Sequence, residues 1–377
     1  MNIAVIGTGM VGRLIAVELS KKYQVCAIDN DANNLSKLAK YNNRIVTKKI
    51  DIRNEPFLDS LEDAEIVINC VPGFMGFETS KKILEKKTCV DISFMPEDCN
   101  ELNTTSEKAK TALYPDAGVA PGLSNIIVGN LITKQKVDEI KIMVGGLPIE
   151  KNPPWNYKAP FSPIDVIEEY TRPARIKKNG IIETVKPLTG LINFEFENVG
   201  KLEAFLTDGL RTLLTTELTK NTSTLLEYTI RYPGHSKKIS DLIEDGKLDD
   251  TVKTIDGKLT SQREITSEEL FNEWKLAEDD KEFTLLVITA TTKEGDEISC
   301  IVYDEWRDGW SSMSRTTGLT ACAITNLIID KKLTKIGVVT PEDLGTNQTF
   351  FDYIINYLKE RKITINFANE ENSLEIK

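Results

Sequence analysis

The sequence predicts an α/β protein with two domains: a doubly wound parallel sheet at the N-terminal end and then a mixed α+β domain. Two observations predict the first domain. Short apolar runs alternate with amphipathic stretches up to about residue 116, and a glycine-rich turn over residues 7–12 separates the first run from the first helix. A third observation predicts the second domain, because from Ile140 onward the apolar runs become β-rich and their connections longer.

The opening segment has the order strand, glycine turn, helix, strand, acid. Residues 2–6 form a short apolar run, residues 13–21 carry apolar side chains at helical spacing, and residues 25–28 form a second apolar run that ends at Asp29. The turn reads Gly7-Thr8-Gly9-Met10-Val11-Gly12. This order predicts the first βαβ unit of a dinucleotide-binding Rossmann domain.

Each glycine of the turn is expected to have its own physical role. Gly7 permits the tight turn, Gly9 lets the main chain approach a pyrophosphate, and Gly12 lets the helix pack close to the strand. Free N–H groups at the helix start, together with the helix dipole, favour phosphate. Cofactor contacts are therefore expected along the whole turn, at Gly7, Thr8, Gly9, Met10, Val11 and Gly12.

The acid after the second strand favours NAD over NADP. Asp29 lies 22 positions after Gly7, near the distance at which a carboxylate accepts a hydrogen bond from a ribose 2′-hydroxyl. The same carboxylate would repel a 2′-phosphate. Asn30 and Asp31 follow, and no arginine stands there to reverse the preference. We therefore expect NAD, with Asp29 and Asn30 at the ribose.

The alternation of strands and helices continues beyond this unit. Ligands of such sheets lie beyond the carboxyl ends of the strands, so the residues there are expected to face the cofactor and substrate. For Asp51, an adenosine contact and a plain turn cap are both open. The expected strands cover residues 44–48, 64–71, 88–92 and 112–114. Cofactor contacts are expected at Asp51, Ile52, Cys70, Val71, Pro72, Asp91 and Ser93, and substrate-side groups at Ser93, Phe94 and Asp116.

The second domain shows strand patterns with longer connections. Residues 141–144 and 191–196 are β-rich runs, and residues 293–296 have the composition of a hairpin turn. Residues 320–329 form a strongly apolar helix that is expected to pack back on the first domain. The expected divisions are a Rossmann domain over 1–128, an α+β substrate and dimerisation domain over 129–312, and a helix and tail over 313–377 that return to the Rossmann domain.

Composition argues against several classes of protein. The net charge of −11 and the pI of about 5.0 do not suit a nucleic-acid binder. The apolar start is too short for a signal peptide, and no apolar run approaches the roughly 18 residues of a membrane span. None of the six cysteines has CxxC spacing and His235 is the single histidine, so no metal site is expected. These features favour a reduced, cytoplasmic location.

Four longer strings carry a family resemblance. Together they resemble the saccharopine dehydrogenase family, and more closely its lysine 6-dehydrogenase-like branch, which is also similar around Glu203-Ala204-Phe205. The resemblance extends from Gly7 to Val339. The strings are Pro115-Asp116-Ala117-Gly118-Val119-Ala120-Pro121-Gly122, Gly145-Gly146-Leu147-Pro148, Asn156-Tyr157-Lys158-Ala159-Pro160-Phe161-Ser162-Pro163 and Arg231-Tyr232-Pro233-Gly234-His235.

This resemblance implies an often dimeric enzyme that transfers hydride between a nicotinamide and a carbon bonded to nitrogen. Ser93 and Phe94 match a Ser-Tyr pair that contacts the substrate in the family's reductases, and Phe161 matches a tryptophan of the same pocket. Asp116 matches a glutamate at a strand end. The segment Thr229-Ile230-Arg231-Tyr232 matches a Thr-Leu-Arg-Tyr segment that touches the substrate.

The chain also departs from the saccharopine reductases of this family. Ala120 stands where the reductases have an aspartate, and their Asn-Arg-Asp string is absent near Leu206 to Gly209. Their usual cofactor is NADP, which Asp29 opposes. These departures argue against saccharopine as the substrate. Residues 151–312 also hold few arginines, which favours lysine, with one carboxylate, over saccharopine, with three.

The candidate catalytic residues each have a functional and a structural interpretation. Arg231 is expected to bind a substrate carboxylate with two parallel hydrogen bonds, or else to form a structural ion pair. Arg211 is a second candidate, or else a helix-surface residue. His235 would move a proton or fix a turn. Asp116 would orient the substrate ammonium, act as a base, or cap a helix.

Three further residues are assigned to the substrate pocket. Lys158 is expected to serve as an acid or an anion contact, or else to be solvated. Tyr157 and Phe161 are expected to form the pocket wall rather than to react.

The first functional hypothesis is an NAD-dependent amino-acid oxidoreductase that deaminates lysine at its ε-carbon. The second keeps the fold and changes the chemistry to saccharopine reduction or a carboxyspermidine-type reductive condensation. The third, from another class, is a non-catalytic NAD sensor. All three predict a small-molecule ligand, no nucleic-acid or membrane partner, and for the enzymes a homodimer.

Overall fold

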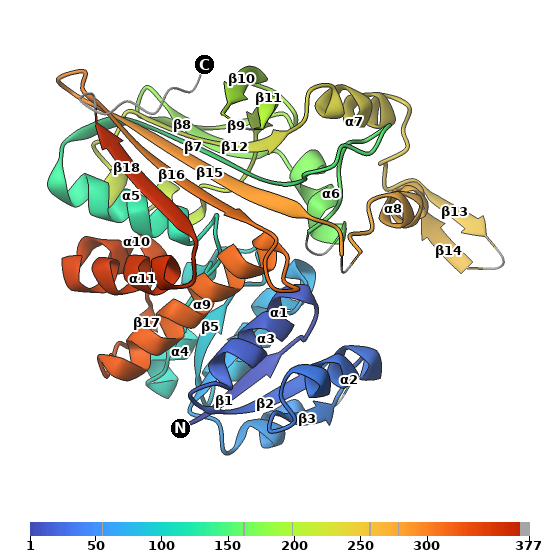
Figure 1. Ribbon diagram of the computed structural model, residues 1–377, viewed down its shortest axis with the longest axis vertical. Coiled ribbons are helices and arrows are strands. Elements are labelled where there is room, and N and C mark those ends of the chain that lie inside the picture. Colours follow the sequence, from blue (N-terminus) through green and yellow to red (C-terminus); the bar gives the residue numbers. More distant parts are fainter. Residues whose placement is uncertain (55, 161–162, 198, 256–257, 278, 370–377) are drawn as a thin grey trace. The chain divides into compact units, whose positions relative to one another are not determined.

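The computed structural model describes the chain except for residues 55, 161–162, 198, 256–257, 278 and 370–377. The chain divides into two compact units (Figure 1). The first unit combines Met1–Gln135 with Met313–Ile363, and the second combines Lys136–Ser312 with the segment that begins at Thr364. Among the described residues, no helix has both the length and the apolar character needed to cross a membrane.

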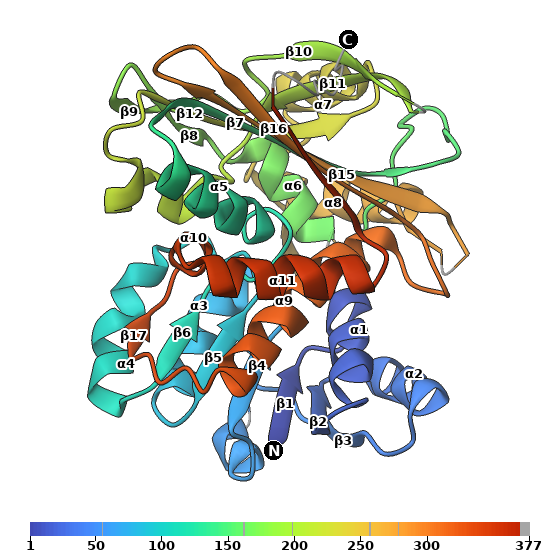
Figure 2. The ribbon, with the colours of Figure 1, turned by 60° about the vertical axis from the view of Figure 1, so that its left-hand side comes forward.

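The first unit is built on a parallel sheet of seven strands in the order β17-β6-β5-β4-β1-β2-β3 (Figure 2). The order reverses between β1 and β4, which is the switch point where sheets of this kind bind dinucleotides. The predicted doubly wound sheet is confirmed. The strands are β1 (Asn2–Ile6), β2 (Gln24–Asp29), β3 (Val46–Lys49), β4 (Ile66–Asn69), β5 (Thr88–Asp91), β6 (Ala112–Tyr114) and β17 (Gly337–Val338).

Burial explains the strand pattern of this sheet. All four residues of β4 are buried, as are Ile3 to Ile6 of β1, because both faces of a parallel sheet are covered. Their continuous apolar runs follow from this. The helices of the unit are α1 (Met10–Leu19), α2 (Ala32–Tyr41), α3 (Gly73–Leu84), α4 (Asn103–Ala109), α5 (Leu123–Lys134), α9 (Ser312–Asp330), α10 (Pro341–Thr346) and α11 (Gln348–Glu360).

The second unit is built on a mixed sheet of nine strands. The main path is β10-β11-β12-β7-β15-β16-β18, with β8 pairing β12 and β9 at one side. The pair β12 and β7 is parallel and the other pairs are antiparallel. The strands are β7 (Val137–Pro148), β8 (Ala174–Lys178), β9 (Ile181–Val185), β10 (Ile192–Phe196), β11 (Gly200–Leu206), β12 (Thr224–Arg231), β15 (Glu282–Thr292), β16 (Glu297–Glu305) and β18 (Thr364–Asn369).

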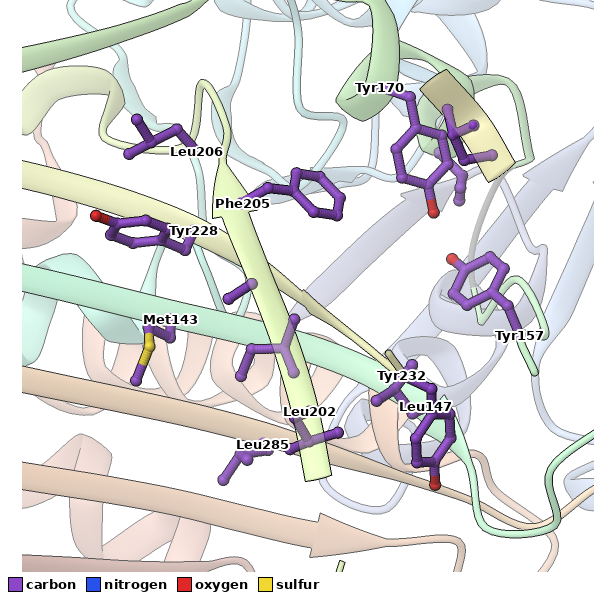
Figure 3. Packing of buried hydrophobic residues seen from close by; sticks show 14 of the residues in the cluster. Met143, Leu147, Tyr157, Tyr170, Leu202, Phe205, Leu206, Tyr228, Tyr232 and Leu285 are labelled. Atoms are coloured by element: carbon purple, nitrogen blue, oxygen red, sulfur yellow. The ribbon is translucent and has the colours of Figure 1, made fainter. Parts of the chain in front are cut away.

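The remaining elements of the second unit are α6 (Pro163–Thr171), α7 (His235–Glu244), α8 (Gln262–Glu273) and a separate hairpin, β13 (Val252–Ile255) with β14 (Lys258–Ser261). Aromatic side chains contribute strongly to its core. Figure 3 shows Phe205 of β11 beside the ring of Tyr170 of α6, and their ring centroids are 5.9 Å apart. Trp274 is fully buried at the end of α8.

The C-terminal segment corrects one expectation. We expected residues 313–377 to return as a whole to the Rossmann domain, but β18 pairs antiparallel with β16 of the second unit. The physical reason is that β16 would otherwise be an edge strand with unpaired main-chain groups. Ile363, directly before β18, and Ile365 within it are buried, and the residue between them is exposed, which suits a strand with one covered face.

Candidate functional site

The three glycines of the turn differ in what surrounds them: protein atoms lie close to Gly7 and Gly12, and the space beside Gly9 is open. Gly7 has φ +86°, and a Cβ on it would lie 2.6 Å from the carbonyl oxygen of Cys70. A Cβ on Gly12 would lie 1.9 Å from the carbonyl oxygen of Gly7. A Cβ on Gly9, by contrast, would meet nothing within 4 Å. Gly7 and Gly12 are therefore required by the protein's own packing, whereas the space over Gly9 is open to a ligand.

The start of α1 offers main-chain donors to an anion. Its N-cap residue is Gly9, no side chain caps it, and its first turn contains no acidic residue. The first N–H groups of a helix have no partner within the helix. The amides from Met10 to Gly12 can thus take a diphosphate, as the sequence predicts. The residues fit the cofactor that the motif implies.

Asp29, at the end of β2, has a fixed carboxylate. The main-chain N–H and the hydroxyl of Thr8 both donate to its Oδ2, at 2.6 and 2.9 Å, and the N–H of Asp31 donates to its Oδ1 at 2.8 Å. The amide of Thr8 is thereby directed at Asp29 rather than at a phosphate. Asn30 is exposed directly after Asp29.

Asp51 and Ile52, shortly after β3, take structural positions. Asp51 accepts hydrogen bonds from the Nε and Nη2 of Arg53 at 2.8 and 2.6 Å and from its main-chain N–H at 3.1 Å. These bonds hold the pKa of Asp51 near 2. Of the two interpretations left open, the contacts are those of a turn cap. Ile52 packs in the core of the unit, where Ile6 and Val67 are its companions.

The segment Cys70-Val71-Pro72 lies against Gly7 of the glycine turn and leads into α3, whose N-cap residue is Pro72. Burial raises the pKa of the Cys70 thiol well above its usual value, so the thiol stays neutral. Its carbonyl is the group that excludes a side chain at Gly7.

Asp91 and Ser93 form a buried cluster at the ends of β4 and β5. Asp91 accepts from Asn69 Nδ2 at 2.7 Å and Ser80 Oγ at 2.6 Å through one oxygen. Its other oxygen accepts from the main-chain N–H and the hydroxyl of Ser93, at 2.8 and 2.7 Å. Burial raises the pKa of Asp91 to about 6. A Cβ on Gly76 would lie 1.9 Å from Ser93 Oγ, so α3 covers that hydroxyl.

This cluster alters the expected roles of both residues. We expected Asp91 and Ser93 to contact the cofactor, and Ser93 also the substrate. The two residues are 1% and 4% exposed and are hydrogen-bonded to each other, so these contacts support the structure around the ends of the strands. The backbone beyond them is unusual: Phe94 has φ +55° and Asp116, after β6, has φ +50°. Non-glycine residues in this region are uncommon and cluster at functional sites.

In the second unit Arg231 ends β12 and is enclosed by partners. Its Nε donates to Tyr170 Oη at 2.8 Å, its Nη1 to the carbonyl of Ile230 at 2.8 Å, and its Nη2 to Glu169 Oε2 at 2.7 Å. Its guanidinium also lies over the ring of Tyr157, 4.4 Å from the centroid. The side chain is 3% exposed. Of the two interpretations of Arg231, these contacts are those of a structural ion pair.

The position of His235 argues against the proton-shuttle interpretation. Its Nδ1 lies 3.1 Å from the carbonyl oxygen of Trp155, and its Nε2 lies 3.0 Å from Tyr170 Oη. Burial, with Arg231 nearby, lowers the pKa of His235 to about 3. Trp274 also packs edge-on against the Trp155 ring beside it. Both ring nitrogens are engaged within the protein, so the imidazole is neutral and structural.

The other sequence-predicted residues of this unit that the structure describes each have their own contacts and do not form one cluster. Tyr232 Oη donates to the carbonyl of Pro148 at 3.0 Å. Lys158 Nζ donates to the carbonyl of Lys275 at 3.2 Å in an exposed hydrogen bond, and the residue is half-buried. Arg211 has φ +54° and is 7% exposed at the start of a short 3₁₀ turn, so it is not a helix-surface residue. Phe161 lies outside the described residues.

One cluster was missed by the sequence reasoning. Glu227 of β12 accepts from Thr207 Oγ1 at 2.5 Å and from the N–H of Gly209 at 3.1 Å, and Thr207 Oγ1 also lies 2.9 Å from Thr229 Oγ1. Burial raises the pKa of Glu227 to about 8. The sequence does contain a pattern that could have indicated this cluster: Glu227, Thr229 and Arg231 alternate along one strand and so share one face.

Comparison with known proteins identifies both parts of the chain. Residues 3–120 match the family described as "Saccharopine dehydrogenase NADP binding domain", and residues 118–363 match "Saccharopine dehydrogenase C-terminal domain". The mitochondrial alpha-aminoadipic semialdehyde synthase of Rattus norvegicus is 23% identical over 266 residues, and that of Mus musculus is 24% identical over 268 residues. Each match covers 66% of this chain and 28% of the relative, so the chain spans little more than a quarter of these curated proteins.

A solved structure shows the same fold over nearly the whole chain. Apo saccharopine dehydrogenase (L-Glu forming) from Saccharomyces cerevisiae has a TM-score of 0.80 at 18% identity, covering 98% of this chain and 99% of that one. Most of the first unit thus matches a domain for a nicotinamide dinucleotide, and the C-terminal domain model covers Lys136–Ser312 of the second unit together with the returning segment Met313–Ile363 of the first. The chain therefore belongs to the saccharopine dehydrogenase family of oxidoreductases.

Proposed function

We propose that the protein is an NAD-dependent dehydrogenase that oxidises a C–N bond of an amino acid, with the ε-carbon of lysine as the preferred site. The observation that carries this proposal is the glycine turn with its uncapped helix start beside the fixed carboxylate of Asp29. In the reaction, the carbon bearing the neutral amino group would give up a hydride to the oxidised nicotinamide while its nitrogen loses a proton to solvent, and an imine would remain. Water then adds to the imine carbon, and ammonia leaves as the aldehyde forms.

The choice of NAD rests on charge. Asp29 can accept from a ribose hydroxyl and would repel a 2′-phosphate. The opposing feature is Lys49, which is the register partner of Asp29 on β3 and is exposed. The name of the matching family domain refers to NADP. We propose NAD because the carboxylate is held in place, whereas an exposed lysine keeps its freedom to turn away.

The choice of lysine over saccharopine rests on the arginines of the second unit. Saccharopine carries more carboxylates than lysine and would need more free guanidinium groups. Arg172, Arg175, Arg231 and Arg263 each contact a carboxylate of the chain itself. These arginines are thus already neutralised, which favours the substrate with fewer negative charges.

Saccharopine reduction is the second candidate. It is favoured by the yeast structure, which is named as a saccharopine dehydrogenase and shares the fold. A carboxyspermidine-type condensation has the same hydride step, and a non-catalytic NAD sensor would share only the first unit's binding site.

We further propose that the protein acts as a homodimer. We also propose a reducing compartment such as the cytoplasm, because its six cysteines are free thiols.

A spectrophotometric screen tests these alternatives. Purified protein receives NAD or NADP with lysine, saccharopine or a diamine, while formation of reduced nicotinamide is followed by its absorbance. Turnover of lysine with NAD is the expected result. Turnover only of saccharopine with NADP would replace both choices, and NAD binding without any turnover would favour the sensor. Sedimentation equilibrium of the same sample checks the dimer.

A further inference from the structure

The contacts of Thr8 set it apart from the other residues of the glycine turn. Thr8 is fully buried, and both of its donors, the main-chain N–H and the hydroxyl, point at the same oxygen of Asp29. The other carboxylate oxygen is held by the N–H of Asp31, the N-cap residue of α2, and Asn34 of α2 reaches Oδ2 at 3.4 Å. The carboxylate is therefore held from the turn after β1 on one side and from the start of α2 on the other.

We propose that Thr8 is a specificity-determining residue, which fixes the Asp29 carboxylate so that it excludes a cofactor with a 2′-phosphate. This inference rests on the proposed preference for NAD and extends it to a residue that need not touch the cofactor through its side chain. It assigns the hydroxyl of Thr8 to the choice of nucleotide rather than to phosphate binding.

To exclude a 2′-phosphate, the Asp29 carboxylate must be held rigidly, whereas it can bind a ribose hydroxyl even when it is free to rotate. A carboxylate that is free to rotate can still turn toward a ribose hydroxyl when NAD binds, and it can turn away when a 2′-phosphate approaches. A carboxylate held by charge-assisted hydrogen bonds from Thr8 and Asp31 must break those bonds to turn away. Such bonds are the stronger class of hydrogen bond, so the repulsion of the phosphate is not relieved.

Because Lys49 lies on the neighbouring strand, exclusion of NADP depends more strongly on the position of the Asp29 carboxylate. This lysine is the register partner of Asp29 and offers a cation to a 2′-phosphate on the neighbouring strand. If Asp29 turned aside, the charge beside the ribose would change from negative toward positive. The bonds from Thr8 keep the negative group in place, and discrimination between the two nucleotides should therefore depend on them.

The test compares Thr8→Val, which keeps the shape of the side chain and loses the hydroxyl, with Thr8→Ser, which keeps the hydroxyl. Dissociation constants of NADH and NADPH are measured by fluorescence titration of the full-length protein, so that no turnover is needed. We expect Thr8→Val to lower the preference for NADH over NADPH about tenfold, which corresponds to about 1.4 kcal/mol. We expect Thr8→Ser to keep the wild-type ratio. Thr8→Ala serves in place of the valine variant if that one melts much below wild type.

The outcomes separate this inference from the proposed function. Equal ratios in wild type, Thr8→Val and Thr8→Ser would overturn the role of Thr8. A wild type that prefers NADPH would overturn the cofactor choice, while the change between wild type and Thr8→Val would still report whether Thr8 controls the ratio. The identity of the amino-acid substrate affects neither comparison.

Discussion

At the scale of single residues, the hydrogen bonds around His235 fix its tautomer. A carbonyl oxygen can only accept, so Nδ1 must carry the proton that points to Trp155. Because the ring is neutral, Nε2 accepts from Tyr170 Oη, which in turn accepts from Nε of Arg231. The direction of every hydrogen bond from Arg231 to Trp155 thus follows from which groups can only donate or only accept.

This tautomer is directly measurable because His235 is the only histidine of the chain. The lowered pKa of about 3 predicts that its ring signals do not titrate between pH 8 and pH 5, where an ordinary histidine of pKa 6.5 would take up a proton. We expect ¹⁵N NMR of the labelled protein to show one Nδ1–H tautomer throughout that range. In Tyr170→Phe the Nε2 signal should shift while Nδ1 stays protonated. A ring that titrates near pH 6.5 would contradict the assignment.

Glu227 gives a prediction about stability and pH. Its pKa of about 8 in the folded protein is raised from 4.5 by burial, so folding is favoured while the group is protonated. Stability from this group is complete below about pH 4.5 and is lost as the pH rises toward 8, at about 1.4 kcal/mol per pH unit. In Glu227→Gln this loss is absent, because the amide oxygen can still accept from Thr207 and cannot ionise.

The measurement is the melting temperature of wild type and Glu227→Gln at pH 5 and pH 8. We expect the wild type to lose more stability than the variant between these values. Other groups, such as Asp91, contribute the same pH dependence to both proteins, so their contributions cancel in the comparison. Parallel pH dependence in the two proteins would mean that Glu227 is already ionised at pH 5.

At the scale of elements, the glycine turn predicts a contrast between two alanine variants. Gly12→Ala would place a methyl group 1.9 Å from the carbonyl oxygen of Gly7, so α1 would have to move away from the sheet. Gly9→Ala would place its methyl group in open space. We expect Gly12→Ala to lower the melting temperature by several degrees, since overpacking typically costs about 1–3 kcal/mol. We expect Gly9→Ala to melt like wild type and to bind NADH at least tenfold more weakly. A Gly9→Ala protein with normal affinity would show that the space does not belong to the cofactor.

At this scale, the sequence predicts those parts of the site whose residues lie close together in the chain. The turn, the helix start and Asp29 lie within 23 consecutive residues, and the spacing of glycines and apolar positions is enough to place them. The surroundings of Arg231 could not be predicted in this way. Its partner Tyr170 is 61 positions away in the sequence and Glu169 is 62, so only the fold brings them together. For the same reason Ser93 was expected at a ligand, while the helix that covers it begins 20 positions earlier.

At the scale of the whole molecule, the chain builds its first unit from two separate segments. Gly318 of α9 approaches α1 so closely that a Cβ on it would lie 2.9 Å from a methyl carbon of Leu14. A Cβ on Gly345 of α10 would lie 2.0 Å from the carbonyl oxygen of Ile126 in α5. Contacts this close, one to a side chain and one to the main chain, mean that the segment Met313–Ile363 is an integral layer of the unit and not an appendage.

This arrangement predicts which fragments fold. Met1–Gln135 alone leaves the faces of α1 and α5 uncovered, so we expect it to aggregate or to unfold without a sharp transition. A chain in which a flexible linker joins Met1–Gln135 to Met313–Ile363 restores the missing layer, and we expect cooperative thermal unfolding with NADH affinity within a few-fold of the full protein. Calorimetry and fluorescence titration of the two proteins measure both properties. Tight NADH binding by Met1–Gln135 alone would show that the first segment carries the cofactor site without the layer that the second segment supplies.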